Sequence, residues 1–234
     1  AHAGTDSPLN KVAGLGFHGT VDETGLAEIE QIFAHRGTPV QVELSTLADP
    51  EIGRMLTRRG YLLQGFEHVL GLQLSGVDPP TTQNSGLEIA QSSLTQLDVW
   101  LDTIVSGFAA PDGQGVATHE EFPRDALERV MADMAVADGS IRFIARRGDA
   151  VAGGATLRIH DGTAQLCGAA TLPAHRRQGV QTALLTARLA HAAAAGCDLA
   201  VVTTLPGSQS HHNVQRRGFS LLYARAMLLK TQGN

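Results

Sequence analysis

The residues best suited to bind a charged ligand lie in one short loop of this sequence. Between an expected strand and the helix that follows it, the loop contains Arg176, Arg177 and Gly179. Amide groups at a helix N-terminus bind anions, and a glycine lets a phosphate approach the backbone closely. Because Thr182 adds a hydroxyl donor and the arginines add charge, the loop is a candidate phosphate site. An ordinary exposed loop between a strand and a helix is the alternative.

Few side chains are candidates for proton transfer. Tyr223 lies on an expected hydrophobic strand, where it can donate a proton or simply pack with its hydroxyl in water. His211 and His212 lie early in the last expected helix, and imidazole titrates near neutral pH. Adjacent side chains on a helix diverge, and no carboxylate follows four residues later. We therefore expect no metal site there.

The loop and the chain around it resemble the GNAT superfamily of acyl-CoA-dependent N-acyltransferases. The run RRQGVQT at 176–182 is similar to the R/Q-x-x-G-x-G/A loop of that family. The run SHHNVQRRGF at 210–219 is similar to its helix that ends in Gly-Phe. The resemblance covers about 87–234, with Gln181 where the family usually has Gly or Ala, and Val214 where many members have Tyr.

The resemblance implies that acetyl-CoA is the acyl donor, as a cosubstrate, and that no metal takes part. It places the pantetheine arm against the end of the strand, the pyrophosphate in the loop, and the thiol beside the last helix. The implied cofactor-binding residues are Thr171, Leu172, Arg176, Arg177, Gln178, Gly179, Val180, Gln181, Thr182, Ser210 and Asn213. Tyr223 and His211 remain the candidate catalytic residues.

The elements that position these residues include an internal repeat. Segments 37–74 and 196–230 each run through a glycine, an apolar strand, a turn with proline, a helix ending in Arg-Arg-Gly-aromatic, and a hydrophobic strand. We therefore expect a degenerate partial GNAT-like unit over 1–78, a linker over 79–86 and a GNAT acetyltransferase domain over 87–234. The first unit lacks the arginine–glycine loop, so it should complete the sheet or line the cleft without binding CoA.

Helices and strands alternate in the second segment, with both hairpins and crossovers. The expected strands are Leu87–Ser92, Ile141–Arg147, Val151–His160, Thr163–Leu172, Asp198–Thr204 and Phe219–Leu229. The expected helices are Leu94–Phe108, Pro123–Ala137, Gln178–Ala195 and Ser208–Arg217. This order predicts an α/β protein with a mixed sheet (the α+β mixed type), which is the GNAT acyltransferase fold with an N-terminal half-repeat.

A second glycine motif, Gly14-x-Gly16-x-x-Gly19, matches the dinucleotide fingerprint. That fingerprint requires a buried strand before it and a strand–helix–strand unit around it. Residues 1–13 show no apolar strand, so we expect a flexible turn before a helix over 23–34. A nicotinamide-binding protein is the alternative.

Composition excludes several classes of protein. Of 234 residues 43% are hydrophobic, and no stretch approaches 18 apolar residues, so we expect no membrane span. Residues 1–80 hold 5 Lys or Arg against 10 Asp or Glu, which accounts for the whole net charge of −5. No segment is basic, which argues against nucleic acid as a partner. We expect reduced cysteines in a cytoplasmic protein, although a Cys167–Cys197 bridge is an alternative.

The resulting hypothesis is an enzyme that moves an acetyl or short acyl group from acetyl-CoA to an amine of a small molecule, by direct attack in a ternary complex. If the acidic first segment lines the cleft, it favours a cationic amine, with Glu43, Glu67 and His68 as candidate cleft residues. Solvation of an edge strand explains those three equally well. The alternative function is a CoA-binding or interaction protein on a GNAT scaffold that has lost catalysis.

Overall fold

The structure, a computed structural model, describes residues 7, 9–17, 19, 21–75, 86–110 and 123–231. Its strands are β1 (Lys11–Leu15), β2 (Val40–Ser45), β3 (Leu62–Gln73), β4 (Glu88–Gln91), β5 (Ser140–Arg147), β6 (Ala150–His160), β7 (Thr163–Thr171), β8 (Leu199–Thr204) and β9 (Ser220–Lys230). Its α-helices are α1 (Glu23–His35), α2 (Pro50–Arg58), α3 (Leu97–Ala109), α4 (Arg124–Val136), α5 (Val180–Ala194) and α6 (Gln209–Gln215). Two 3-10 turns are η1 (Leu94–Gln96) and η2 (Pro173–His175).

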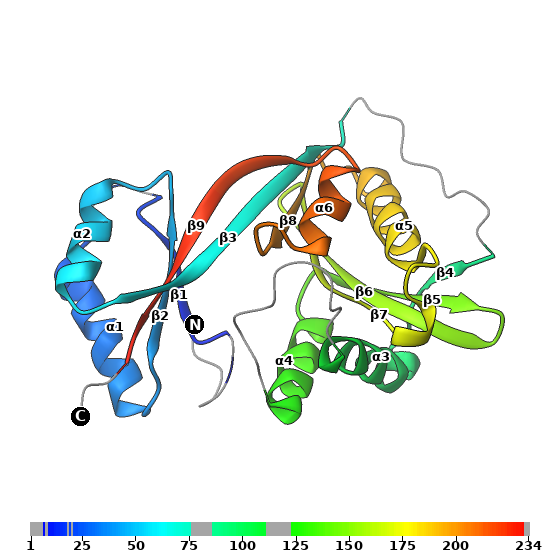
Figure 1. Ribbon diagram of the computed structural model, residues 1–234, viewed down its shortest axis with the longest axis horizontal. Coiled ribbons are helices and arrows are strands. Elements are labelled where there is room, and N and C mark those ends of the chain that lie inside the picture. Colours follow the sequence, from blue (N-terminus) through cyan, green and yellow to red (C-terminus); the bar gives the residue numbers. More distant parts are fainter. Residues whose placement is uncertain are drawn as a thin grey trace.

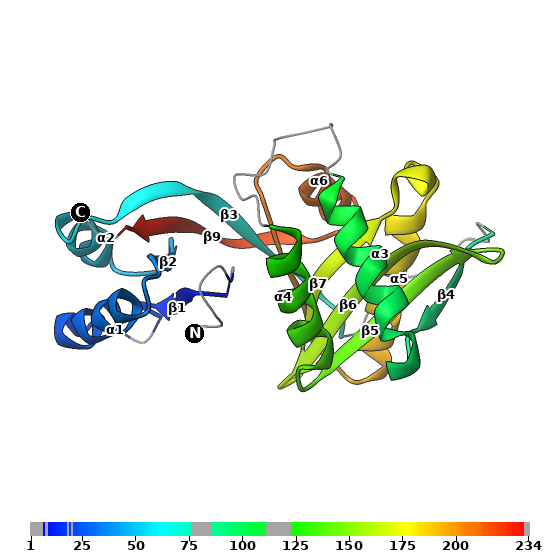
Figure 2. The ribbon, with the colours of Figure 1, turned by 90° about the horizontal axis from the view of Figure 1, so that it is seen from below.

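The described strands form one nine-stranded sheet in the order β1-β2-β9-β3-β8-β7-β6-β5-β4 (Figures 1 and 2). The pairs β1–β2 and β7–β8 are parallel, and the other neighbours are antiparallel. This confirms the mixed sheet and the α/β class predicted from the sequence. The linker expected over 79–86 lies outside the described residues except for Gly86.

Helices cover both faces of the sheet in the second segment. Two adjacent residues of β6 show this, because successive side chains of a strand point to opposite faces. A side chain at Gly153 would meet Val180 and Leu184 of α5, whereas one at Gly154 would meet Trp100 of α3. Trp100 is fully buried, and its Nε1 donates a 3.3 Å hydrogen bond to the Ala155 carbonyl. The helices α3 and α5 therefore pack on opposite sides of the central strands, as Figure 2 shows.

Strands from the two halves of the chain are interleaved. β9 lies between β2 and β3, and β3 lies between β9 and β8. The runs β1-α1-β2-α2-β3 and β7-α5-β8-α6-β9 have the same order of elements, and each begins with a parallel strand pair. The ribbon view shows β3 and β9 running side by side from one group of helices to the other (Figure 1). The relation of the first run to a GNAT half-unit, and the domain boundaries, stay predictions.

The repeated Arg-Arg-Gly-aromatic motif ends a helix in both halves. Gly60 and Gly218 follow α2 and α6 with φ of 84° and 89°, a left-handed conformation that favours glycine. The next amide, of Tyr61 or Phe219, donates to the carbonyl five residues back. Both aromatic rings are buried. The motif is thus a helix C-cap that turns the chain into the following strand.

Residues 1–13 show no apolar strand pattern, yet the structure has a strand that begins there and runs into the glycine motif. β1 (Lys11–Leu15) contains Gly14 and pairs in parallel with β2. The strand is short and no residue of it is fully buried, so its side chains show no apolar pattern. Backbone hydrogen bonds to β2 hold it at the edge of the sheet, and these do not depend on side-chain type.

Candidate active site

The parallel ladder between β7 and β8 stops before either strand ends. Its pairs run from Thr163–Leu199 to Leu166–Val202, whereas β7 continues to Thr171 and β8 to Thr204. Just beyond Leu166, the register between β6 and β7 shifts at a bulge that contains Gly168, with φ of 46°. The ends of β7 and β8 therefore form the two walls of a wedge in the sheet.

Each wall of the wedge ends in a threonine with an unsatisfied hydroxyl. The Oγ1 atoms of Thr171 and Thr204 are buried and have no hydrogen-bond partner within the described residues. A buried polar atom without a partner costs about 1–3 kcal/mol. These hydroxyls fit a ligand that brings polar groups between the strands, such as the amides of a pantetheine arm.

The predicted anion loop joins β7 to α5. Arg177 and Gly179 have positive φ values of 59° and 80°, and α5 begins directly afterwards, at Val180. Among the described residues no side chain caps α5, whereas Asp22 caps α1 and Ser208 caps α6. The first-turn amides of α5 and the positive end of its dipole are therefore open to an anion.

The two arginines of the loop differ in their contacts. The guanidinium of Arg176 donates to the carbonyls of Thr171 and Gly107, both at 3.4 Å, and to that of Ala110. It therefore ties the loop to the end of α3, while Arg177 is exposed. Outside the loop, Arg147 Nη2 donates to the Gln178 carbonyl at 3.3 Å. Arg177 and Arg147 thus supply positive charge at the mouth of the loop.

Arg188 is a buried cation that the sequence analysis missed. It lies on α5 with 3% of its surface exposed, and it donates to the carbonyls of Leu184 and Thr156. No carboxylate pairs with it in the described part of the chain, and burial lowers its pKa to about 10. Thr156 pairs with Cys167 beside the bulge. The positive charge of Arg188 therefore lies near the base of the wedge, where it favours developing negative charge. Leu184 and Ala192, four residues before and after Arg188 on the helix, are both apolar, and this spacing could have indicated that Arg188 lies on the buried face.

The two predicted catalytic residues lie on opposite faces of the sheet. Tyr223 of β9 pairs with Val69 of β3, and its ring contacts Phe17 edge to face at 5.5 Å. His211 contacts His68, which is the residue before Val69 on β3. Because successive side chains of a strand point to opposite faces, His68 points to the face opposite Val69 and Tyr223. The structure does not bring Tyr223 and His211 together.

The remaining predicted residues of α6 lie on its outer surface and in the core. Ser210 is exposed, and Asn213 Oδ1 accepts hydrogen bonds from Gln209 at 3.0 Å and Arg216 at 2.6 Å. Val214, where many GNAT enzymes have Tyr, is buried against the central hydrophobic cluster. α6 therefore places no phenol at this position.

His211 is buried, and hydrogen bonds occupy both of its ring nitrogens. Its Nδ1 lies 3.2 Å from the Gly207 amide, and its Nε2 lies 3.3 Å from Nδ1 of His68. Burial lowers the pKa of His211, as does charge on the neighbouring His68 of β3 and His212 of α6. The sequence does not predict the contact of His211 with His68, because 143 residues separate them.

We expect His211 to make stability depend on pH. Its folded-state pKa lies below the ordinary 6.5, so the folded protein binds fewer protons there than the unfolded chain. This contribution is present above pH 6.5 and is lost as the pH falls through the folded-state pKa, with a slope of at most about 1.4 kcal/mol per pH unit. Urea unfolding between pH 7.5 and 5 measures it. His211→Gln should flatten the curve, whereas His212→Gln, an exposed neighbour, should not; equal slopes for wild type and His211→Gln would contradict it.

The candidate cleft carboxylates of the first segment are paired with cations. Glu43 is 5% exposed and contacts Lys11 Nζ at 2.7 Å and the guanidinium of Arg225. Glu67 contacts Nη2 of the same arginine at 2.6 Å. These two carboxylates therefore join β2, β9 and β3 and do not present bare negative charge to a substrate.

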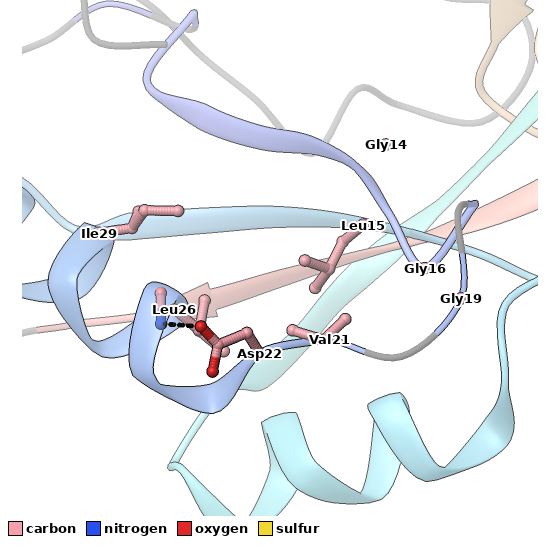
Figure 3. A pocket seen from close by; sticks show the side chains of 9 residues that line it. Gly14, Leu15, Gly16, Gly19, Val21, Asp22, Leu26 and Ile29 are labelled. Atoms are coloured by element: carbon pink, nitrogen blue, oxygen red, sulfur yellow. Dashed lines mark hydrogen bonds between the residues drawn. The ribbon is translucent and has the colours of Figure 1, made fainter.

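The glycine motif of the first segment borders a hollow at the start of α1 (Figure 3). The Asp22 carboxylate accepts from the amides of Thr24 and Gly25 at 3.0 and 3.2 Å, so its own negative charge occupies the helix N-terminus. A side chain at Gly16 would meet Ile52 at 2.6 Å, which explains this glycine by packing. The hollow therefore does not offer the open anion site that a dinucleotide pyrophosphate needs.

Other chemical groups are accounted for within the described residues. Cys167 and Cys197 are free thiols, and burial raises the pKa of both. In that part of the chain, no three His, Cys, Asp or Glu side chains are placed to hold a metal ion. No described helix is long and apolar enough to cross a membrane.

Comparisons with known proteins bear on the same region. Residues 109–219 match the acetyltransferase (GNAT) family. A search of curated proteins found no match. Solved structures share the fold. A GCN5-related N-acetyltransferase from Kribbella flavida has a TM-score of 0.63 at 20% identity, over 89% of this chain and 74% of that one.

Two further structures extend the likeness. A GCN5-related N-acetyltransferase from Sphaerobacter thermophilus has a TM-score of 0.67 at 12% identity, over 98% of this chain and 76% of that one. A tandem GNAT protein from the clavulanic acid biosynthesis pathway has a TM-score of 0.65 at 15% identity, over 91% and 70%. At these identities the likeness shows the fold, which is that of GNAT N-acetyltransferases.

Proposed function

Residues 109–219 match the acetyltransferase (GNAT) family, and from this premise we propose that the chain moves an acetyl or short acyl group from acyl-CoA to an amine of a small molecule. The match to this family supports acyl-CoA-dependent N-acetyltransferase activity in general.

One observation carries the cofactor assignment: α5 begins without a side-chain cap, directly after the glycine loop at the end of β7. The amides at 179–182 would hold the pyrophosphate, with Arg177 and Arg147 adding charge. The hydroxyls of Thr171 and Thr204 would pair with the pantetheine arm between the strands. Acetyl-CoA supplies a thioester carbonyl, an acyl carbon open to attack by an amine.

The reaction balances without a covalent enzyme intermediate. The amine nitrogen forms a bond to the acyl carbon, the carbon–sulfur bond breaks, and the thiolate takes up the proton that the nitrogen loses. The amine must be neutral to attack. The buried cation of Arg188 favours negative charge near the base of the wedge.

The test is thiol release from acetyl-CoA across a panel of small amines, together with calorimetry of acetyl-CoA binding. We expect micromolar binding and turnover of at least one amine. Two observations favour the alternative of a CoA-binding protein without catalysis: Val214 lies in the core where many GNAT enzymes have Tyr, and Tyr223 lies on the face opposite His211. Binding without turnover of any amine would support that alternative.

A further inference from the structure

His68 is a residue of the first segment that meets the second segment beside the wedge. β3 carries it into the sheet next to β8, where it pairs with Thr204, the last residue of that strand. Side chains at paired positions of antiparallel strands lie on one face, with Cβ atoms about 4.5–5.5 Å apart. His68 therefore neighbours the Thr204 hydroxyl, which is buried and unsatisfied within the described residues.

Hydrogen bonding fixes which nitrogen of each ring holds a proton. The Gly207 amide can only donate, so Nδ1 of His211 accepts, and the proton of the neutral His211 ring is on Nε2. That Nε2–H donates to Nδ1 of His68 at 3.3 Å. The proton of neutral His68 must then be on its own Nε2. Adding a proton to either ring would set two N–H groups against each other.

This arrangement gives the two rings different roles. Both nitrogens of His211 are used, one by Gly207 and one by His68. The Nδ1 atom of His68 accepts from His211, and its Nε2–H donates no hydrogen bond to any of the described residues. The rings cross at 66° with centroids 5.0 Å apart, so α6 and β3 hold the pair as one unit.

We infer that His68 donates a hydrogen bond from Nε2 to the sulfur of the bound thioester and stabilises the departing thiolate, while His211 is a positioning residue that fixes its tautomer. The inference rests on the proposed acyl transfer. His68 keeps its proton throughout, because the thiolate takes its proton from the attacking nitrogen. The first segment thus contributes a catalytic residue as well as strands.

A pair of amide substitutions tests the inference with little change in packing. The amide nitrogen of glutamine reaches the position of Nε2, whereas that of asparagine reaches the position of Nδ1. We expect His68→Gln to retain thiol release from acetyl-CoA within about fivefold, and His68→Asn to lose about 100-fold in kcat, the usual cost of one donor to developing charge. The dissociation constant for acetyl-CoA should stay unchanged in both.

The readout is release of the thiol with water as acceptor, so no amine need be known. The exposed His212 offers matched controls, because His212→Gln and His212→Asn should behave alike. Equal kcat values for His68→Gln and His68→Asn would overturn the inference and leave the proposed function standing. No thiol release by the wild-type protein, with water or any amine, would overturn both.

Nitrogen NMR of the histidine rings gives a readout besides activity. In the free protein we expect the Nε2–H tautomer for both His68 and His211. Coenzyme A should shift the His68 Nε2 signal, whereas desulfo-coenzyme A, which lacks the sulfur, should not. Equal shifts with the two ligands would contradict a hydrogen bond to sulfur.

Discussion

Gly179→Glu should lower the affinity for acetyl-CoA by at least about 100-fold while the protein stays folded. An added Cβ at Gly179 meets no atom within 4 Å, so the first carbon of the new side chain causes no clash. Its φ of 80° adds about 1–2 kcal/mol of backbone strain. A carboxylate about 4 Å from a phosphate charge costs about 4 kcal/mol near a protein surface, and screening by salt reduces this. The loss should therefore fall on binding.

Gly196→Glu is a matched control at the opposite end of α5. Gly196 has a φ of 77° and also leaves a Cβ free of contacts. Both variants should therefore show similar losses of stability on thermal unfolding. Calorimetry should find weakened acetyl-CoA binding only for Gly179→Glu. Unchanged affinity in that variant would refute the placement of the pyrophosphate in this loop.

A fragment of residues 87–234 should not fold on its own. Among the described strands β9 has β2 and β3 as its neighbours in the sheet, and both come from the first segment. β8 would also lose β3, its partner on the side away from β7. Eleven residues of β9 would then expose backbone groups and apolar side chains such as the buried Met227 and Leu228. Circular dichroism and amide NMR should show an unfolded or aggregated chain.

The control for this experiment is the whole chain, cut after folding. A protease site placed in the 79–86 segment and cleaved in the native protein should leave two fragments that elute together and bind acetyl-CoA. Such a result would show that strand pairing, and not chain continuity, holds the halves together. A fragment 87–234 that binds acetyl-CoA as tightly as the full chain would contradict the prediction.

The sequence predicted the second segment closely because its signals are local. The helix predicted to begin at Gln178 begins at Val180, since Gly179 adopts a left-handed conformation just before it. The helix predicted over 94–108 is a 3-10 turn followed by α3. Hydrophobic spacing and turn residues act over a few positions, so these elements were found nearly at their bounds.

Local signals do not predict the structure where backbone pairing between distant strands decides it. The sequence did not predict β1, because an edge strand with partly exposed side chains has no apolar pattern. The pairing of Glu43 and Glu67 with Arg225 also escaped the sequence analysis, because it joins residues up to 182 positions apart. Charge counts along the chain therefore overstated the negative surface of the first segment.

The sequence by itself determined the glycine loop before α5, the order of helices and strands, and the repeated helix ends, all of which arise from interactions between near neighbours. Only the tertiary structure decided that β3 lies between β9 and β8, and that His68 therefore meets His211 and Thr204. Backbone hydrogen bonds between strands are nearly the same for every residue type. A strand's composition thus marks which face it buries, while its neighbours follow from the packing of the whole chain.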